Sequence, residues 1–129
     1  MANVSSRLAR IVKALDIQPG DRILEIGCGH GVAVSLICPM LMDGHITAID
    51  RSEKMLTAAR KRNARWVEQG VAEFILGDLE TIDLGDRRFN KAVAVRVGLF
   101  HRSSNYARAL TERWLEPGGQ VFSFYDTPG

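Results

Sequence analysis

The sequence of 129 residues has few of the side chains that form metal sites or disulfides. Its two cysteines, Cys28 and Cys38, form no Cys-x-x-Cys pair, and there are three histidines, His30, His45 and His101. The histidines have no partners at the spacing of zinc ligands, so we expect no metal site. One cysteine in a glycine-rich turn and one in an apolar stretch indicate reduced thiols and a cytoplasmic protein.

Long apolar runs and a strong charge of either sign are also missing. No apolar stretch approaches the roughly 18 residues of a membrane-spanning helix, and the N-terminus shows no basic segment followed by an apolar one. We therefore expect a soluble, unexported protein with no membrane partner. The formal net charge is only +2. The basic residues clustered at 60–65 favour a solvated helix face, so we expect no nucleic-acid partner.

Repeats, low-complexity segments and linkers are absent as well, so we expect residues 1–129 to form a single domain. Helical and strand patterns alternate along this domain. The patterns predict helices from Ser5 or Ser6 to about Leu15 and over 32–41, 52–70 and 104–115, and strands over 22–26, 45–50, 74–76, 89–97 and 120–125. Such alternation predicts an α/β fold with a doubly wound, mainly parallel sheet of about five strands and helices on both faces. Ligands of these sheets bind at the carboxyl ends of the strands.

A glycine-rich turn follows the first predicted strand. Its glycines stand at positions 27, 29 and 31, and Glu25 comes two residues before the first of them. Strand, tight turn and helix form a nucleotide-binding arrangement, because missing side chains let a ligand approach the backbone. Val32 occupies the position where a dinucleotide-binding turn needs a small residue, which leaves a NAD-dependent oxidoreductase as a remote alternative. No Gly-Lys-Ser/Thr follows, so a Walker-type phosphate loop does not fit.

The residues around this turn resemble a known family. The segment Leu24-Glu25-Ile26-Gly27-Cys28-Gly29-His30-Gly31 is similar to the first motif of the class I (Rossmann-like) S-adenosylmethionine-dependent methyltransferases. Residues 46–52 resemble that family's second strand, whose terminal acidic residue, here Asp50, holds the ribose hydroxyls. A carboxylate suits that role because it accepts two hydrogen bonds from adjacent hydroxyls. Asp50 follows Gly31 by one helix and one strand, as the family requires.

The resemblance continues over nearly the whole chain. Gly77-Asp78-Leu79 resembles the family's adenine-binding segment, although Asp78 also fits an ordinary turn. Residues 96–101 stand where the family places the floor of the transfer site, and Glu116-Pro117-Gly118-Gly119 precedes the last strand as in the family. The cofactor-binding residues that the resemblance implies are Glu25, Gly27, Cys28, Gly29, Gly31, Asp50, Arg51, Gly77, Asp78, Leu79 and Arg96.

The resemblance implies S-adenosylmethionine as cofactor, S-adenosylhomocysteine as product, and methyl transfer to an acceptor. His101 and Arg96 are the candidates for a catalytic side chain, although an ordinary loop role fits His101 equally well. The Asp/Asn-Pro-Pro-aromatic motif of amino-directed methyltransferases is absent, and Arg96-Val97-Gly98-Leu99 occupies its place. We therefore expect a small-molecule acceptor, whose identity the sequence does not specify.

The sequence departs from the family at its C-terminal end. The family's sheet has seven strands, the last two forming a hairpin, whereas this sequence stops soon after the fifth predicted strand. We expect Val121, Phe122 and Phe124 to lie on an exposed edge strand that favours a homo-oligomer. The main alternative to an active methyltransferase is a domain that binds the cofactor with little or no catalysis alone.

Overall fold

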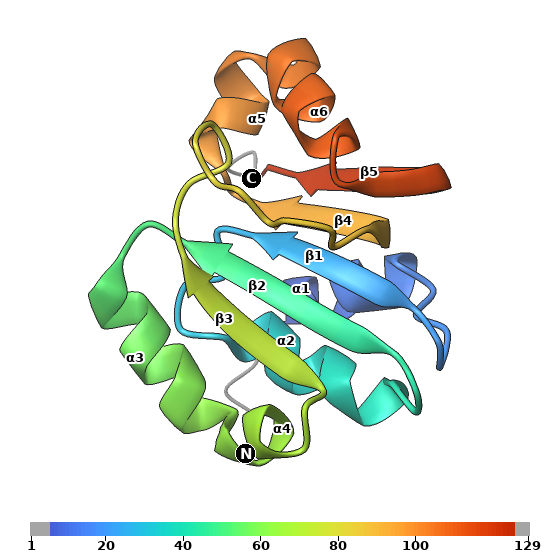
Figure 1. Cartoon of the computed structure of the whole chain (residues 1–129), viewed down its shortest axis with the longest axis vertical. Coiled ribbons are helices and arrows are strands. Elements are labelled where there is room, and N and C mark those ends of the chain that lie inside the picture. Colours follow the sequence, from blue (N-terminus) through green and yellow to red (C-terminus); the bar gives the residue numbers. More distant parts are fainter. Residues whose placement is uncertain (1–5, 126–129) are drawn as a thin grey trace.

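The five strands form one parallel sheet in the order β3-β2-β1-β4-β5 (Figure 1). The computed structural model describes residues 6–125. The strands are β1 (Arg22–Ile26), β2 (His45–Asp50), β3 (Ala72–Leu76), β4 (Phe89–Val95) and β5 (Leu115–Phe124). The strand order reverses where β1 pairs with β4, which is the place where open α/β sheets bind ligands.

Helices cover both faces of this sheet, as predicted. They are α1 (Ser6–Ala14), α2 (Val32–Ile37), α3 (Glu53–Arg62), α4 (Ala64–Glu68), α5 (Gly98–Arg102) and α6 (Ser104–Glu112). Val12 of α1 and Leu56 of α3 pack in one core cluster, and Phe100 of α5 packs in the other. Neighbouring residues of β1 point to opposite clusters, Ile23 to the first and Leu24 to the second. The sheet is therefore buried on both faces, which is usual for parallel sheets, and the predicted fold class is confirmed.

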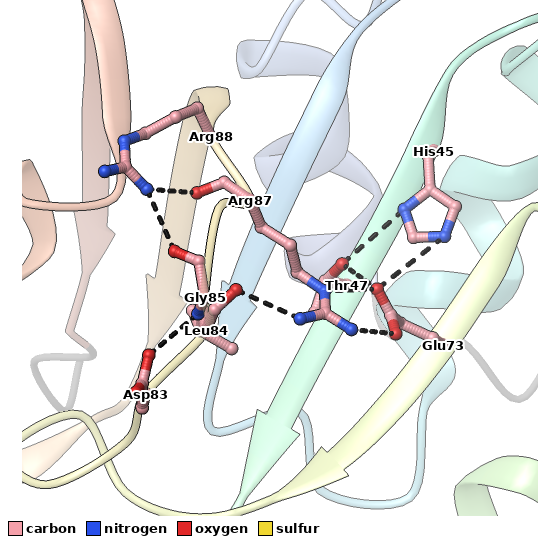
Figure 2. A network of polar contacts seen from close by, with 8 residues as sticks. All are labelled: His45, Thr47, Glu73, Asp83, Leu84, Gly85, Arg87 and Arg88. Atoms are coloured by element: carbon pink, nitrogen blue, oxygen red, sulfur yellow. Dashed lines mark hydrogen bonds and ion pairs between the residues drawn. The ribbon is translucent and has the colours of Figure 1, made fainter.

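A polar network holds down the connection from β3 to β4, residues 77–88, which contains no helix (Figure 2). Arg87 in this connection donates from Nε and Nη2 to the two carboxylate oxygens of Glu73 on β3, at 2.9 and 3.0 Å. The hydroxyl of Thr47 on β2 donates to the same carboxylate at 2.8 Å. Leu79 and Leu84, both buried, join the second core cluster. An ion pair and two leucines thus attach this connection to the sheet.

Three predicted helices end earlier than expected. The helix predicted over 52–70 begins after Ser52, whose side chain accepts from the Met55 amide as a cap, but it breaks at Asn63 into α3 and α4. The helix predicted over 32–41 ends at Ile37 and continues as a 3₁₀ turn, Cys38–Met40, because Pro39 has no N–H to donate. The helix predicted over 104–115 ends at Glu112.

Some strand boundaries also differ. The strand predicted over 89–97 ends at Val95, because Arg96 adopts a left-handed backbone with φ of 58°, and the helix α5 that follows was not predicted. β5 begins at Leu115 rather than at residue 120, with an irregular register opposite Phe89 and Lys91. Within residues 6–125, β5 forms one edge of the sheet, and no helix is long and apolar enough to cross a bilayer. The predicted cap Ser5 lies outside the described residues.

Candidate functional site

Two hollows lie at the carboxyl ends of strands β1 to β4 and share Gly27, Val95 and Arg96 in their walls. The first hollow lies among the segments that follow β2, β3 and β4, and α5 contributes to its rim. The second hollow lies between the glycine turn (residues 27–31), the start of α2 and Arg7 and Leu8 of α1. From the predicted cofactor residues, the first hollow contains Gly27, Asp50, Arg51, Gly77, Asp78, Leu79 and Arg96. The second contains Glu25, Gly27, Cys28, Gly29 and Arg96.

The three glycines of the turn have three different surroundings, although each has a positive φ. A Cβ on Gly27 would lie 2.9 Å from Cγ2 of Val97, and one on Gly31 would lie 2.7 Å from Nδ2 of Asn63. A Cβ on Gly29 would meet no heavy atom within 4 Å. The backbone at Gly27 and Gly31 is therefore packed against the protein, whereas Gly29 faces open space. Gly31, although predicted to bind the cofactor, lines neither hollow.

Asp50, at the end of β2, is fixed by two backbone amides. Its Oδ2 accepts from the amide of Gly29 at 2.8 Å, and its Oδ1 accepts from the amide of Ser52 at 2.9 Å. The carboxylate thus ties the end of β2 to the glycine turn at the wall of the first hollow. Each carboxylate oxygen can accept a further hydrogen bond, so Asp50 retains capacity for the two hydroxyls of a ribose.

Glu25 is buried at the wall of the second hollow, with only 3% of its surface exposed. Its Oε1 has no hydrogen-bond partner among residues 6–125. Burial, and secondarily the charge of Asp50, raises the pKa of Glu25 to about 8. The carboxyl is therefore largely protonated at neutral pH, and a buried carboxyl with an unused oxygen is suited to a ligand that brings a hydrogen-bond donor or positive charge.

The segment after β3 forms the far side of the first hollow. The Gly77 amide donates to the Asp50 carbonyl at 2.9 Å, which places this segment beside the end of β2. Asp78 Oδ1 accepts from the amides of Glu80 and Thr81 at 2.9 and 3.2 Å. Asp78 therefore closes a turn and also lines the hollow, and its contact with the adenine stays a prediction.

Arg96 stands where the two hollows meet. It is a non-glycine residue with φ of 58°, and its amide donates to the carbonyl of Phe124 at 2.7 Å. Such a conformation is unfavourable for a residue with a side chain and tends to persist at functional sites. The hydrogen bond to β5 holds this conformation and keeps Arg96 at the junction.

The remaining candidates do not have the surroundings of catalytic groups. His101, on α5, is exposed and stacks on Tyr125 with ring centroids 4.2 Å apart, and it lines neither hollow. Cys28 is buried, and burial raises the pKa of its thiol far above its usual value, which argues against a nucleophile. Within residues 6–125, no three His, Cys, Asp or Glu side chains are grouped to hold a metal ion.

Sequence reasoning missed several residues of the two hollows. Arg7 and Leu8 line the second hollow because α1 packs beside it, and α1 contains no sequence motif that predicts a binding site. Arg102 enters the first hollow from the unpredicted helix α5. A Cβ on Gly98 would lie 2.6 Å from Arg102 Nη1, so the guanidinium lies directly over the turn that leads from β4 into α5.

Known proteins share this fold and these sequence features. The family model of the methyltransferase domain matches residues 23–119. The chain is 34% identical over 119 residues to the "Putative methyltransferase YrhH" of Bacillus subtilis, which covers 91% of this chain and 64% of that protein. It is 32% identical over 114 residues to an uncharacterized 37.1 kDa protein in transposon TN4556 of Streptomyces fradiae, which covers 86% of this chain and 32% of that protein.

A solved structure shows the same architecture. It is a SAM-dependent methyltransferase from Thiobacillus denitrificans in complex with S-adenosyl-L-homocysteine, with a TM-score of 0.76 and 25% identity. The match covers 92% of this chain and 47% of that one. The chain thus spans from about a third to about two thirds of the length of these matched proteins. Because the family model covers most of the chain and the fold agrees, this chain belongs to the methyltransferase domain family.

Proposed function

We propose that this chain binds S-adenosylmethionine in the two hollows and serves methyl transfer to a small-molecule acceptor. The observation that carries the proposal is the 2.8 Å contact between the Asp50 carboxylate and the Gly29 amide. This contact joins the carboxylate that we assign to the ribose to the one glycine of the turn that faces open space, which supports the proposal. A single ligand that occupies both hollows would meet both features.

The residues of the two hollows fit the parts of this cofactor. Asp50 would accept the ribose hydroxyls, and Gly77, Asp78 and Leu79 would contact the adenine in the first hollow. The second hollow would take the methionyl end, where the unused oxygen of Glu25 provides an acceptor for its cationic amino group. Arg51 and Arg96 of the predicted set also line the first hollow.

The chemistry of the cofactor, when bound, is that of a methyl group on a sulfonium, which a nucleophilic atom of the acceptor takes in line. The chain's own contribution is orientation, because holding two reactants in attack geometry lowers the barrier substantially. Arg96 is the candidate for contact with the acceptor, because it lies at the junction of the hollows. His101 is not assigned as a base, since it lines neither hollow.

Calorimetric titration of the purified chain with S-adenosylhomocysteine tests the proposal. We expect micromolar binding, about −8 kcal/mol, with a stoichiometry of one. Titration with NADH under the same conditions is the control, and we expect no heat from it. A well-folded chain that binds NADH instead of S-adenosylhomocysteine would favour the oxidoreductase alternative, and one that binds neither would overturn the assignment.

A second candidate is a domain that binds the cofactor but does not catalyse transfer alone. Within residues 6–125, β5 is an edge strand, and an edge strand is suited to pairing with another chain, which a domain that acts only with a partner would need. Two measurements separate the candidates: methyl-transfer assays with a panel of small-molecule acceptors, and determination of the mass of the chain in solution. Turnover would favour the enzyme, and binding without turnover the second candidate. We also propose a single domain over residues 1–129 and a cytoplasmic location.

A further inference from the structure

One fully buried polar side chain, that of Asn63, contacts the glycine turn and lines neither hollow. Asn63 has no exposed surface and separates α3 from α4. Its Nδ2 donates to the carbonyls of Gly31 and Ala59 at 3.1 and 3.0 Å. The Ser35 hydroxyl, on α2, lies 2.8 Å from its Oδ1. The hydrogen-bonding capacity of this side-chain amide is thus used inside the protein, which is the condition for burying it without a large penalty.

This arrangement acts on the backbone of the turn. The Gly31 carbonyl has Asn63 Nδ2 and the Ser35 hydroxyl, each at 3.1 Å, as side-chain neighbours. The hydroxyl has one hydrogen, so it donates either to this carbonyl or to Asn63 at a given moment. Arg62, adjacent to Asn63, donates from Nε to the His30 carbonyl at 3.2 Å. Two successive carbonyls of the turn are therefore held by two successive residues at the end of α3.

The packing leaves Gly31 no freedom to shift toward α3. A Cβ there would lie 2.7 Å from Asn63 Nδ2, 3.0 Å from the Cβ of Ala59 and 3.2 Å from its Cα. The other end of the turn is fixed by the amides of Gly27 and Cys28, which donate to the Ile49 carbonyl at 2.9 and 3.0 Å. Gly29, between these two anchors, is the glycine that faces open space.

We propose that Asn63 is a positioning residue for the cofactor, which fixes the glycine turn through the Gly31 carbonyl without touching the ligand. The inference rests on the proposed function, in which the turn side of the site takes the methionyl end. Loss of Asn63 should therefore disturb the second hollow more than the first, because Asp50 keeps its bond to the Ser52 amide and the Gly77 amide keeps its bond to the Asp50 carbonyl. A displacement of about 1 Å in a site can change its performance by up to about a hundredfold.

The test compares Asn63→Ala with Thr111→Ala, a matched control on α6. Thr111 is also fully buried, and its hydroxyl donates at 2.7 Å to the carbonyl of Ala107, which belongs to the second core cluster. Both residues are far from the glycine turn in the sequence. Each variant is titrated with S-adenosylhomocysteine and with methylthioadenosine, which lacks the amino-acid end. For Asn63→Ala we expect the Kd of S-adenosylhomocysteine to rise about tenfold, the size of effect that one hydrogen bond has, and that of methylthioadenosine to change by less than about twofold. Thr111→Ala should alter neither value.

Equal weakening of both ligands by Asn63→Ala would indicate general destabilisation and would overturn the inference, as would an unchanged pair of values. A second measurement needs no ligand. It is the amide hydrogen exchange of residues 27–36, which should be faster in Asn63→Ala than in Thr111→Ala. Ser35→Ala is a milder change that should also speed the exchange of residues 27–36. It replaces Asn63→Ala in the test if that variant does not fold. Unchanged exchange overturns the inference, whereas a wild-type chain that binds neither ligand overturns only the proposed function.

Discussion

The charge of Asp50 opposes ionisation of Glu25. The two residues end or nearly end the neighbouring strands β2 and β1, and the Asp50 charge adds to the effect of burial in raising the pKa of Glu25 to about 8. The backbone amides of Gly29 and Ser52 hold Asp50 in place. One member of this acidic pair is thus fixed by the backbone, while the other is a buried acid with an unused oxygen.

Glu25→Gln should remove a pH dependence of stability. The folded-state pKa of Glu25 is about 8 against an ordinary value of 4.5, so the folded chain binds more protons than the unfolded chain between these values. This residue therefore lowers the free energy of unfolding as pH rises through that window, by up to about 1.4 kcal/mol per pH unit. Urea unfolding of both chains at pH 5.5 and 7.5 gives the comparison. The free energy of unfolding should fall more from pH 5.5 to pH 7.5 in the wild type than in the variant. An equal fall in both chains would contradict the assigned pKa.

Cofactor binding should release a proton from Glu25. A cationic group placed beside the buried carboxyl favours its ionised form and lowers its pKa. At pH 7 we therefore expect the binding enthalpy of S-adenosylhomocysteine to vary with the ionisation enthalpy of the buffer, with a slope that indicates proton release. Calorimetry in phosphate and Tris measures this slope, and Glu25→Gln is the control, for which the slope should fall toward zero. An equal slope in the variant would assign the proton to another group.

Asp50→Ala should weaken the binding of S-adenosylhomocysteine by about 1–3 kcal/mol, because the two ribose hydroxyls would lose their hydrogen-bond acceptor. The same change frees the Gly29 amide, so part of the effect could come from the turn. Adenine alone, which in this proposal contacts neither Asp50 nor the turn, is the control for the rest of the first hollow, and its affinity should not change. Calorimetric affinities of the variant equal to those of wild type would remove Asp50 from the site.

Alanine substitutions at three glycines should separate ligand contact from packing. Gly29, Gly31 and Gly70 have φ values of 55°, 85° and 74°, so each substitution carries backbone strain, about 1 kcal/mol. Gly31→Ala should destabilise the chain most, since its Cβ would collide with Asn63 and Ala59. Gly29→Ala and Gly70→Ala meet open space and should cost similar, smaller amounts of unfolding free energy.

The same three variants should rank differently by affinity for S-adenosylhomocysteine than by stability. Gly29→Ala places a methyl group on the wall of the second hollow and should weaken binding, whereas Gly70→Ala should leave the Kd unchanged. Urea unfolding and calorimetry on the same preparations provide both rankings. Equal affinities for these two variants would show that Gly29 does not face the ligand.

The parts of the site that could be predicted from sequence lie within short segments. Asp50 and the glycine turn follow strands whose bounds were predicted, because buried parallel strands are continuous apolar runs bounded by turn residues. Asn63 could not be found in this way. In a helical pattern an asparagine indicates a surface position or a helix end, and its partner Gly31 is 32 residues away. Arg7 and Leu8 were missed for a related reason, because only the packing of α1 brings them to the second hollow. The roles of all these residues in binding stay predictions.

The connection over β2 and β3 is attached by the partly exposed Arg87–Glu73 ion pair and by the buried Leu79 and Leu84. The guanidinium of Arg87 holds the pKa of Glu73 below its ordinary value of 4.5, so the attachment persists above this pKa and is lost when acid protonates the carboxylate. The two side chains are 43% and 33% exposed, so salt also screens their attraction. We therefore expect acid or salt to weaken the polar part of this attachment and leave the two leucines as its main support. Because residues 77–79 begin the same connection, the segment that we propose for the adenine would lose part of its support, while the glycine turn keeps its own anchors.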